Sequence, residues 1–405
     1  MGIAILYEHP ETDELGIRMT AKEMGLDLTY IPFHKIAVSI SNGGYSFRSQ
    51  KKNYFKTIDS VNAVLNRTQS KNRRLYAASF LEAIGKYVIN PLQVESLCFS
   101  KFRTLVEFWK QGIKIPKTIF IPCDSHYTTS KGRTIHNEEK IADLITNNLG
   151  ERNIVLKPDA GTHGYNIMLV NDRNELVKIL DETEPSIINP VGFVAQEFVK
   201  KWFYDLRIIV FKERGTPPHC HPKALARAGF KDFRTNTYLG NMVFGINLPL
   251  EVQKAAIQSS KAIGGNSETW LLALDAMFNI GEEESVDDIY IKDQLEKLVI
   301  PFDAVKKVKK DDKKYENFAV WNENLESAYQ HYKDTEAYEN VRTIIEESTE
   351  KEKNSILFHE ANSCPEFWEQ TRIFTEMNLA IQLLKCAKSV EGWSIYQRVR
   401  ENKYE

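Results

Sequence analysis

The stretch IVLKPDAGTHG, residues 154–164, decides which fold this chain is expected to have. Its apolar start predicts a β-strand, and Lys157 ends that strand directly before a proline, so the lysine side chain has a defined direction. Gly161 and Gly164 let the backbone approach a ligand closely and offer N–H groups to an anion. Residues 167–170 predict the second strand of a hairpin. The stretch therefore indicates a polyphosphate-binding loop, although an ordinary hairpin with a surface lysine also fits it, and the Gly-Lys-Ser/Thr of a P-loop is absent.

Composition indicates a globular protein of several domains. The chain has 405 residues, too many for one ordinary core, and its 42% hydrophobic and 27% charged residues are unremarkable values. A net charge of -2 makes a dedicated nucleic-acid partner unexpected, and no apolar run is long enough to predict a membrane span. The N-terminus predicts a strand rather than a signal peptide. Five scattered cysteines without a Cys-x-x-Cys pair predict reduced thiols, so we expect a cytoplasmic protein.

The periodicity of the chain predicts its elements. Strands and helices alternate up to Pro91, which predicts a small parallel α/β domain. Ser100 is a suitable N-cap for an amphipathic helix that reaches about Trp109. Further strands are predicted at 116–121, 194–199, 206–211, 271–277 and 356–361, and further helices at 250–262 and 376–387.

Residues 279–354 differ in character from their surroundings. They are dense in charge, with an acidic run at 282–284 and a lysine-rich run at 306–314, and they have helical spacing around 322–332 and 337–347. This pattern predicts a solvated helical insertion, whose lysines either face water or contact an acidic partner.

Phe233-Arg234-Thr235-Asn236 has the residue types that phosphoryl transfer to a carboxylate needs. Such a reaction concentrates negative charge in its transition state, and the planar fork of an arginine is suited to that charge and to an acyl phosphate.

Asp275, Glu360 and Asn362 offer hard oxygen ligands from two predicted strands. The spacing of two between Glu360 and Asn362 puts both side chains on one face of a strand, and Mg²⁺ prefers a few such oxygens together with substrate phosphates. Asp275 ends the apolar run Leu271–Leu274, where an unpaired charge would be costly, so the alternative is a structural pair with a buried arginine.

These motifs, in this order and together with Gln196-Glu197-Phe198-Val199, resemble the ATP-grasp superfamily, and within it the RimK-like carboxylate–amine ligases. The resemblance implies an ATP-grasp fold of α/β and α+β type, with an N-terminal parallel α/β domain over residues 1–95. A central α+β subdomain over 96–195 and a C-terminal α+β subdomain over 196–405 would clasp ATP, the latter carrying the insertion at 279–354.

The resemblance also implies a role for each site residue. Lys101, Lys157, Gly161 and Gly164 would hold the ATP phosphates. Gln196, Glu197 and Phe198 would lie at the adenine end, and Asp205 would contact the ribose or position a loop. Arg234 would bind the transferring phosphate and the substrate carboxylate, with Asn236 orienting nearby groups. Asp275, Glu360 and Asn362 would bind one or two Mg²⁺, for which Mn²⁺ can substitute.

The implied reaction is ATP- and Mg²⁺-dependent amide formation through an acyl phosphate, adding an amino acid such as glutamate to a peptide or protein. The insertion is a candidate docking site for that acceptor, and we expect its deletion to spare ATP binding. The alternatives are a glutathione-synthetase-like ligase of small peptides and a non-catalytic ATP-binding module of the synapsin type; a homo-oligomer is compatible with each.

The largest departure from the family pattern is the charged insertion, which separates the two metal-ligand strands that most relatives have close together in sequence. Two further departures lie in the predicted site. Asn241 replaces the second of two glycines that usually follow the arginine motif, and Glu366 occupies a position where relatives often have glycine.

Overall fold

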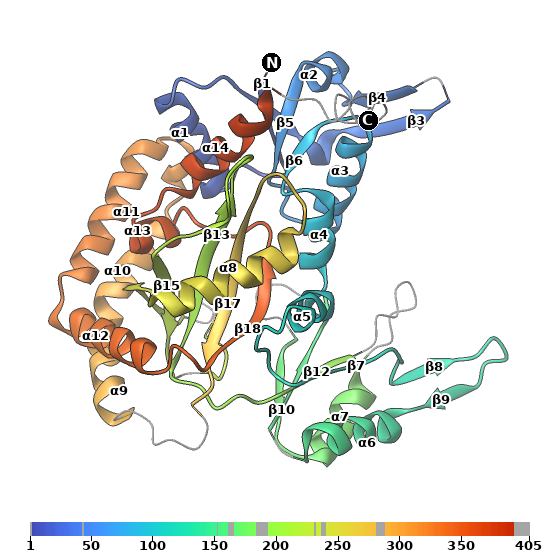
Figure 1. The fold of residues 1–405 in the computed structure, drawn as a ribbon, viewed down its shortest axis with the longest axis vertical. Coiled ribbons are helices and arrows are strands. Elements are labelled where there is room, and N and C mark those ends of the chain that lie inside the picture. Colours follow the sequence, from blue (N-terminus) through green and yellow to red (C-terminus); the bar gives the residue numbers. More distant parts are fainter. Residues whose placement is uncertain are drawn as a thin grey trace.

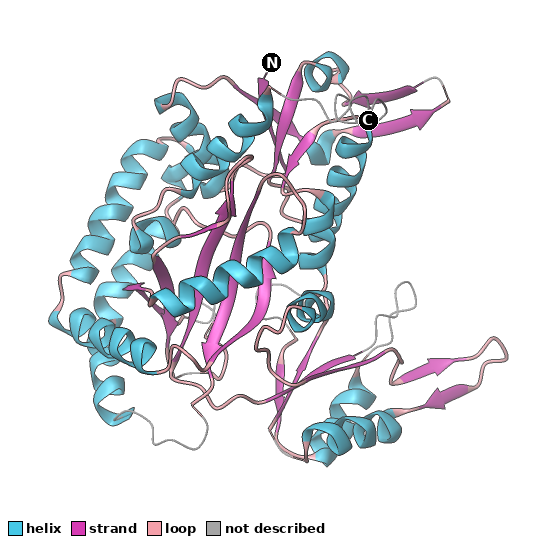
Figure 2. Ribbon diagram, in the orientation of Figure 1, coloured by secondary structure: helices cyan, strands magenta, loops and turns pink. Residues whose placement is uncertain are grey.

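The structure, a computed structural model, describes residues 2–42, 44–151, 153–160, 166–183, 193–230, 232–235, 240–280 and 288–392. Its strands form three main sheets, which follow one another along the chain (Figure 1). The N-terminal sheet lies at the top of the view and the six-stranded sheet, the largest, in the middle. The sheet at the bottom has four strands, like the N-terminal sheet, but fewer residues in them, and is called the smallest sheet below. Helices pack around the two upper sheets, and the lowest sheet has two helices beside it (Figure 2).

The N-terminal sheet has the order β2-β1-β5-β6, and all its neighbouring strands are parallel, as the alternation of elements predicted. Its strands are β1 (Gly2–Tyr7), β2 (Leu28–Pro32), β5 (Val61–Asn66) and β6 (Tyr87–Ile89); the accompanying helices are α1 (Thr12–Glu23), η1 (Phe33–Lys35), α2 (Phe55–Asp59) and α3 (Lys71–Ala83). An unpredicted hairpin, β3 (Ala37–Ser41) and β4 (Gly44–Arg48), extends away from this sheet (Figure 1).

The next two helices lead to the smallest sheet. They are α4 (Leu92–Phe99) and α5 (Lys101–Lys110). Helix α5 begins as predicted, because the Ser100 side chain accepts a hydrogen bond from the Arg103 N–H at 3.0 Å.

The smallest sheet is antiparallel, with the order β11-β10-β12-β7. Its strands are β7 (Thr118–Ile121), β10 (Ile154–Lys157), β11 (Met168–Val170) and β12 (Phe193–Glu197). Two unpredicted helices, α6 (Glu138–Leu149) and α7 (Arg173–Glu182), cover its apolar face. The helix residues that pack against it are Ile141, Ile145, Leu176 and Leu180. A second unpredicted hairpin, β8 (His126–Thr128) and β9 (Thr134–His136), projects beside them (Figure 1).

The largest sheet is antiparallel and has the order β16-β15-β13-β17-β18, with β14 paired to β13. Helix α8 crosses one face of it in Figure 1. Its elements are β13 (Tyr204–Lys212), β14 (His219–Cys220), β15 (Lys223–Ala228), β16 (Met242–Asn247), α8 (Leu250–Gly264), β17 (Trp270–Phe278), β18 (Ile356–Asn362), α13 (Thr371–Thr375) and α14 (Leu379–Glu391).

The insertion is helical, as predicted, but the prediction that it is solvated is wrong. Its elements are α9 (Asp288–Lys297), α10 (Val299–Lys309), η3 (Asp312–Tyr315), α11 (Phe318–Lys333) and α12 (Glu336–Lys351). Leu325, Tyr329 and Tyr332 are fully buried in the main core, and the Tyr332 hydroxyl donates to the Val243 carbonyl of β16 at 3.2 Å. The charges that dominate its composition cover the outer faces of helices whose inner faces are apolar, so deleting the insertion would expose the core.

Close packing and hydrogen bonds connect the N-terminal sheet and its helix α1 to the rest of the fold. Trp368 lies so close to Gly16 of α1 that a Cβ there would be 2.0 Å from its ring, and its Nε1 donates to Asn322 Oδ1 of α11 at 2.9 Å. The Asn90 side chain makes two hydrogen bonds to the backbone of Leu271: its Oδ1 accepts from the N–H at 2.8 Å, and its Nδ2 donates to the carbonyl at 2.7 Å. The division of the chain into three domains, with boundaries at residues 95 and 195, stays a prediction.

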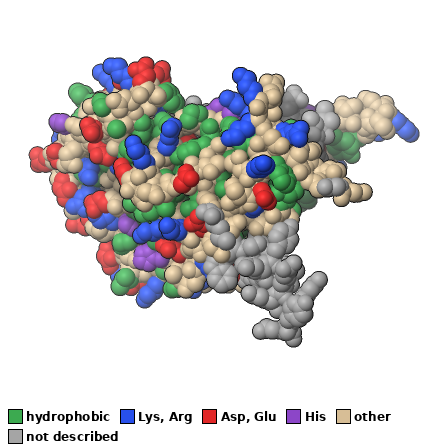
Figure 3. Space-filling model, turned by 90° about the horizontal axis from the view of Figure 1, so that it is seen from above, with side chains coloured by type: hydrophobic (Ala, Val, Ile, Leu, Met, Phe, Trp, Pro, Cys, Tyr) green, Lys and Arg blue, Asp and Glu red, His purple; other side chains and the backbone are tan. Residues whose placement is uncertain are grey.

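On the face seen in Figure 3, acidic and basic side chains are interspersed rather than gathered by sign, in keeping with the small net charge. Of the helices in the described part of the chain, none combines the length and apolarity that crossing a membrane requires.

Candidate active site

A row of charged side chains of both signs crosses the middle of the largest sheet. Arg207 on β13 lies opposite Asp275 on β17, and Asp275 lies opposite Glu360 on β18. The same β13 carries Asp205 opposite Arg227 of β15. Antiparallel pairing brings side chains at facing positions within a few ångströms, so residues as far apart in sequence as Asp275 and Glu360 meet here.

Asp275 is the centre of this row. Both of its oxygens accept from Arg207, at 2.9 Å each, and the Arg227 guanidinium lies 3.4 Å away. Burial raises the pKa of Asp275, but the two guanidinium groups outweigh burial and hold its pKa below the usual value. The structural alternative from the sequence, a pair with a buried arginine, is therefore present, and it keeps the carboxylate ionised.

Glu360 and Asn362 lie beside Asp275. Asn362 Nδ2 is 3.4 Å from Asp275 Oδ2, and Lys101 Nζ is 3.9 Å from Glu360 Oε1. Burial raises the pKa of Glu360, while Lys101 and Lys71 together bring it below its usual value. Two carboxylates held ionised and one amide oxygen, on neighbouring strands, are a donor set that fits Mg²⁺.

The two predicted phosphate lysines are linked through Asp159. Its backbone carbonyl accepts from the Lys101 N–H at 3.0 Å, and its Oδ1 accepts from the Phe102 N–H at 2.8 Å. Asp159 follows Lys157 by two residues, so it joins the end of β10 to the N-terminus of α5. A carboxylate at a helix N-terminus is electrostatically favourable. The hydrogen bonds of Asp159 therefore fix the position of Lys101, at the start of α5, relative to Lys157, at the end of β10.

Lys157 itself is held by Gln196. Its ammonium donates to Gln196 Oε1, while Gln196 Nε2 donates to Thr118 Oγ1 at 2.8 Å. Burial lowers the pKa of Lys157 to about 8, against the opposing effect of Glu360. Gln196 therefore lies in contact with a predicted phosphate ligand.

This pKa predicts that nucleotide affinity falls above pH 8. Below that pH Lys157 is charged and attracts phosphate, and above it the neutral amine loses this attraction, so Kd should rise by up to about tenfold per pH unit. Calorimetry with adenylyl imidodiphosphate between pH 7.5 and 9.5 measures this. Burial also lowers the pKa of Lys201 to about 8, so the Lys157→Arg variant is the control. It should flatten the profile; an unchanged decline in that variant would assign the effect to another group.

Two residues predicted for the adenine end, Glu197 and Phe198, lie at the end of β12 and directly after it. Glu197 Oε1 accepts from the Lys117 N–H at 2.8 Å. The Phe198 ring meets the Phe233 ring edge to face, with centroids 6.5 Å apart. Asp205 is buried, and its oxygens are bound by Arg227 at 2.6 Å and by the Thr235 hydroxyl. Of its two predicted roles, this geometry fits the positioning of a loop.

Arg234 lies on the loop between β15 and β16. Its guanidinium forms a two-pronged pair with Asp232, at 2.9 and 2.7 Å, and its carbonyl accepts from Asn241 Nδ2 at 3.0 Å. Asn241, the departure from the family's second glycine, thus holds the backbone of the arginine. Three other predicted site residues lie outside the described residues: Gly161, Gly164 and Asn236.

Sequence reasoning missed several titratable groups of this site. A β-bulge in β18 makes His359 an extra residue between Phe358 and Glu360, and burial and the nearby Lys157 lower its pKa to about 4, so it is neutral at pH 7. The rule that a buried Asp275 needs a partner predicts an arginine there, but the sequence does not say that Arg207 and Arg227 are the ones. Lys71 and His359 have no sequence signal, because one belongs to a distant helix and the other to a bulge.

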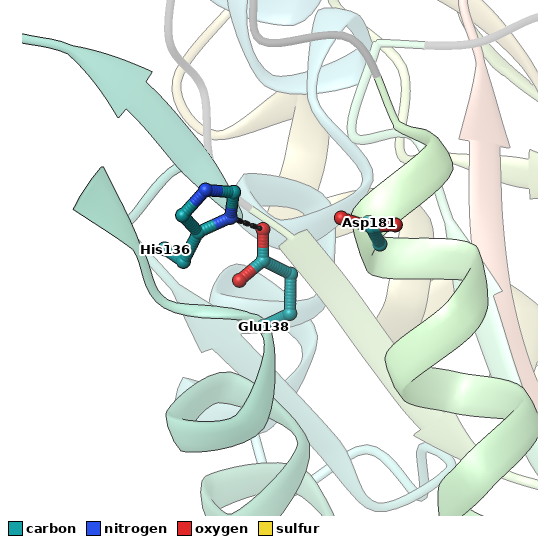
Figure 4. A group of neighbouring side chains, drawn as sticks. All are labelled: His136, Glu138 and Asp181. Carbon is teal, nitrogen blue, oxygen red and sulfur yellow. Dashed lines mark hydrogen bonds and ion pairs between the residues drawn. The ribbon is translucent and has the colours of Figure 1, made fainter. Parts of the chain in front are cut away.

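A second group of ligand-type side chains lies beside the β8–β9 hairpin (Figure 4). In the part of the chain that the structure describes, His136, Glu138 and Asp181 are a set of His, Cys, Asp or Glu residues whose ligand atoms all lie within 4.8 Å of one another. His136 Nδ1 is 3.0 Å and His126 Nδ1 is 3.5 Å from Glu138 Oε1. These contacts tie the hairpin to the start of α6.

Comparison with known proteins identifies the class. Residues 101–277 match the model of the RimK-like ATP-grasp domain. The α-aminoadipate–LysW ligase LysX of Sulfurisphaera tokodaii is 24% identical over 266 residues, covering 65% of this chain and 82% of that protein. The coenzyme γ-F420-2:α-L-glutamate ligase of Methanococcus maripaludis is 26% identical, covering 50% of this chain and 62% of that protein.

One solved structure is similar over nearly the whole chain. It is the RiPP-associated ATP-grasp ligase of Chryseobacterium gregarium in complex with ADP and a leader and core peptide, with a TM-score of 0.52, 13% identity and 96% coverage of both chains. Residues 101–277 are therefore a RimK-like ATP-grasp domain within an ATP-grasp fold. The protein is an ATP-dependent carboxylate–amine ligase.

Proposed function

We propose that this ligase activates a carboxylate of a peptide or protein acceptor and joins it to the amine of an amino acid such as glutamate, in the cytoplasm. The observation that carries the proposal is the convergence of Lys101, Lys157, Asp275, Glu360 and Asn362 at one place, from both sides of the boundary between the smallest and the largest sheet. Relatives named as ligating α-aminoadipate or glutamate to LysW, or glutamate to a coenzyme, support the choice of amino acid and carrier.

The reaction has two steps. An oxygen of the acceptor carboxylate attacks the γ-phosphorus of ATP, the bond from that phosphorus to the bridging oxygen breaks, and ADP leaves, which gives an acyl phosphate. The amine nitrogen then attacks the acyl carbon, the carbon–oxygen bond to phosphate breaks, and the nitrogen loses a proton. No side-chain nucleophile takes part; positioning and charge neutralisation carry the catalysis.

The described side chains divide this work between them. Lys101 and Lys157 bind the phosphates of ATP, and Gln196 orients Lys157. Glu197 and Phe198 lie at the adenine end. Arg234 leaves Asp232 for the transferring phosphoryl group and the acceptor carboxylate, while Asp205 holds the loop through Thr235.

Asp275, Glu360 and Asn362 hold Mg²⁺, which neutralises phosphate charge when bound. We expect Glu360→Gln to raise the Mg²⁺ concentration for half-maximal ADP release by about tenfold or more, because a neutral amide replaces an ionised ligand. Titration of Mg²⁺ at saturating ATP measures it. Glu350→Gln on the outer end of α12 is the matched control, and equal Mg²⁺ requirements in both variants would remove Glu360 from the ligand set.

The proposal is tested by Mg²⁺-dependent ADP release from ATP with single amino acids, combined with N-acetylated dipeptides that end in glutamate. Mass spectrometry identifies the product, which gains one amino-acid residue. Release that needs both an amino acid and a peptide supports the proposal. Equal release with two free amino acids would favour the small-peptide ligase instead.

A further inference from the structure

An apolar cavity of about 250 Å³ adjoins the loop that carries Arg234. Residues 228–230, before the loop, and 240–242, after it, form one side of the cavity, and helices α9 and α10 of the insertion form the other. Leu295 and Val299 line the helical side. The proposed mechanism assigns no role to this space, which is smaller than the roughly 300–1,000 Å³ of sites for drug-sized ligands and is suited to a side chain.

The walls of the cavity are fixed in place and linked to the arginine. Phe230 stacks on Phe203 with centroids 5.6 Å apart, and a Cβ at Gly229 would lie 2.0 Å from Asn241 Oδ1. Asn241 lines the cavity and also donates to the Arg234 carbonyl at 3.0 Å. An occupant of the cavity therefore touches a side chain that holds the backbone of the arginine.

The charged side chains that line the cavity are one of each sign, Lys292 and Glu296, and both are exposed at its rim. The Lys292 ammonium lies 4.8 Å from the Phe230 ring centroid, an attractive cation–π distance, and its side chain is exposed at the cavity. Arg234 lies on the loop that joins the two cavity-lining segments, where it pairs with Asp232. A ligand that fills the cavity with an apolar group can present a carboxylate to Arg234 when this arginine exchanges Asp232 for the substrate.

We propose that this cavity is the specificity subsite for the acceptor, and that it receives an apolar side chain next to the carboxylate that is activated. The inference rests on the proposed function. It gives the insertion a role in acceptor recognition that does not depend on its surface lysines: α9 and α10 complete a subsite whose other half is the arginine loop.

The test measures binding separately from turnover. Calorimetry with Mg²⁺ and adenylyl imidodiphosphate present compares N-acetyl-Leu-Glu and N-acetyl-Phe-Glu with N-acetyl-Ser-Glu and N-acetyl-Lys-Glu. The apolar peptides should bind at least about tenfold more tightly, since the cavity takes an apolar side chain out of water whereas serine and lysine lose hydration there. Equal affinities, or no binding of any peptide, overturn the subsite.

A pair of variants locates the preference. Val299 lines the cavity and is 37% exposed, so Val299→Arg fills the space without burying the new charge, and it should abolish the preference for the apolar peptides. Ile300, its neighbour, is 82% exposed and does not line the cavity, so Ile300→Arg is the control that keeps the preference. Melting curves establish that both variants fold. A preference that survives in Val299→Arg places recognition elsewhere.

Turnover distinguishes the two proposals. If the apolar peptides bind through Val299 but no amino acid is ligated to any peptide, the proposed function fails and the subsite stands. If all four peptides are ligated equally well, the proposed function stands and the subsite fails. If the apolar preference follows the free amino acid instead, the cavity belongs to the amine substrate, and the assignment to the acceptor is wrong.

Discussion

Arg234→Ala is expected to lower the rate of Mg²⁺-dependent ADP release by about a thousandfold while leaving nucleotide affinity nearly unchanged. The guanidinium is the cation proposed to meet the charge that develops during phosphoryl transfer, and alanine leaves that charge without a partner. The side chain is about a quarter exposed, so its loss should not unfold the protein. Single-turnover measurements with saturating ATP separate the chemical step from binding.

Two variants control this experiment. Arg234→Lys keeps the charge but loses the two-pronged fork, so it should recover only part of the rate. Arg173→Ala removes an arginine of α7 that pairs with Asp143 of α6 at 2.6 Å. This pair is remote from the Arg234 loop, so the variant should leave the rate unchanged. A rate for Arg234→Ala within tenfold of the unaltered protein would contradict the proposed role.

Asp232 gives the arginine a resting position that the sequence did not predict. The pair raises the pKa of Arg234 and lowers that of Asp232, so both groups stay charged. For Arg234 to reach a phosphoryl group it must exchange one anionic partner for another. A charge already held in the right loop needs little reorganisation when the substrate arrives.

The sequence predicts those parts of the site that depend on local pattern. The hairpin around Lys157, the capped start of α5 at Ser100 and the same-face spacing of Glu360 and Asn362 each follow from residues close together in the chain. The parallel order of the N-terminal sheet follows from alternating strands and helices.

What the sequence could not give depends on contacts across the fold. The partners of Asp275 come from β13 and β15, and the bulge that inserts His359 is visible only in the register of β17 with β18. The insertion was misjudged for a related reason: composition averages over a helix, whereas burial depends on which face each residue occupies. Tyr329 and Tyr332 lie among charged neighbours in sequence and are fully buried in space.

The largest expected effect on stability comes from Arg227. Its side chain is almost fully buried, 2.6 Å from Asp205 and 3.4 Å from Asp275, so it neutralises two buried carboxylates at once. Arg227→Met fills similar space but removes the charge, and we expect it to lower the free energy of unfolding by about 3–5 kcal/mol. Urea denaturation at pH 7 measures this value, and a loss below about 1 kcal/mol would contradict it.

The pH dependence of that loss identifies its cause. In the unaltered protein the pKa values of Asp205 and Asp275 are lowered, so their ion pairs contribute stability at neutral pH that is lost as the pH falls through those low values. Without Arg227, Asp205 loses the cation that lowers its pKa most, so burial raises that pKa, whereas Arg207 still pairs with Asp275; protonation of Asp205 then relieves part of the penalty. The variant should therefore recover stability relative to the unaltered protein between pH 7 and pH 5. Arg207→Met removes the more exposed partner of Asp275 and leaves Arg227 in place, so its loss should be smaller. A penalty that is the same at both pH values would assign the effect to packing, and Asp275 would then owe its ionised state to Arg207 alone.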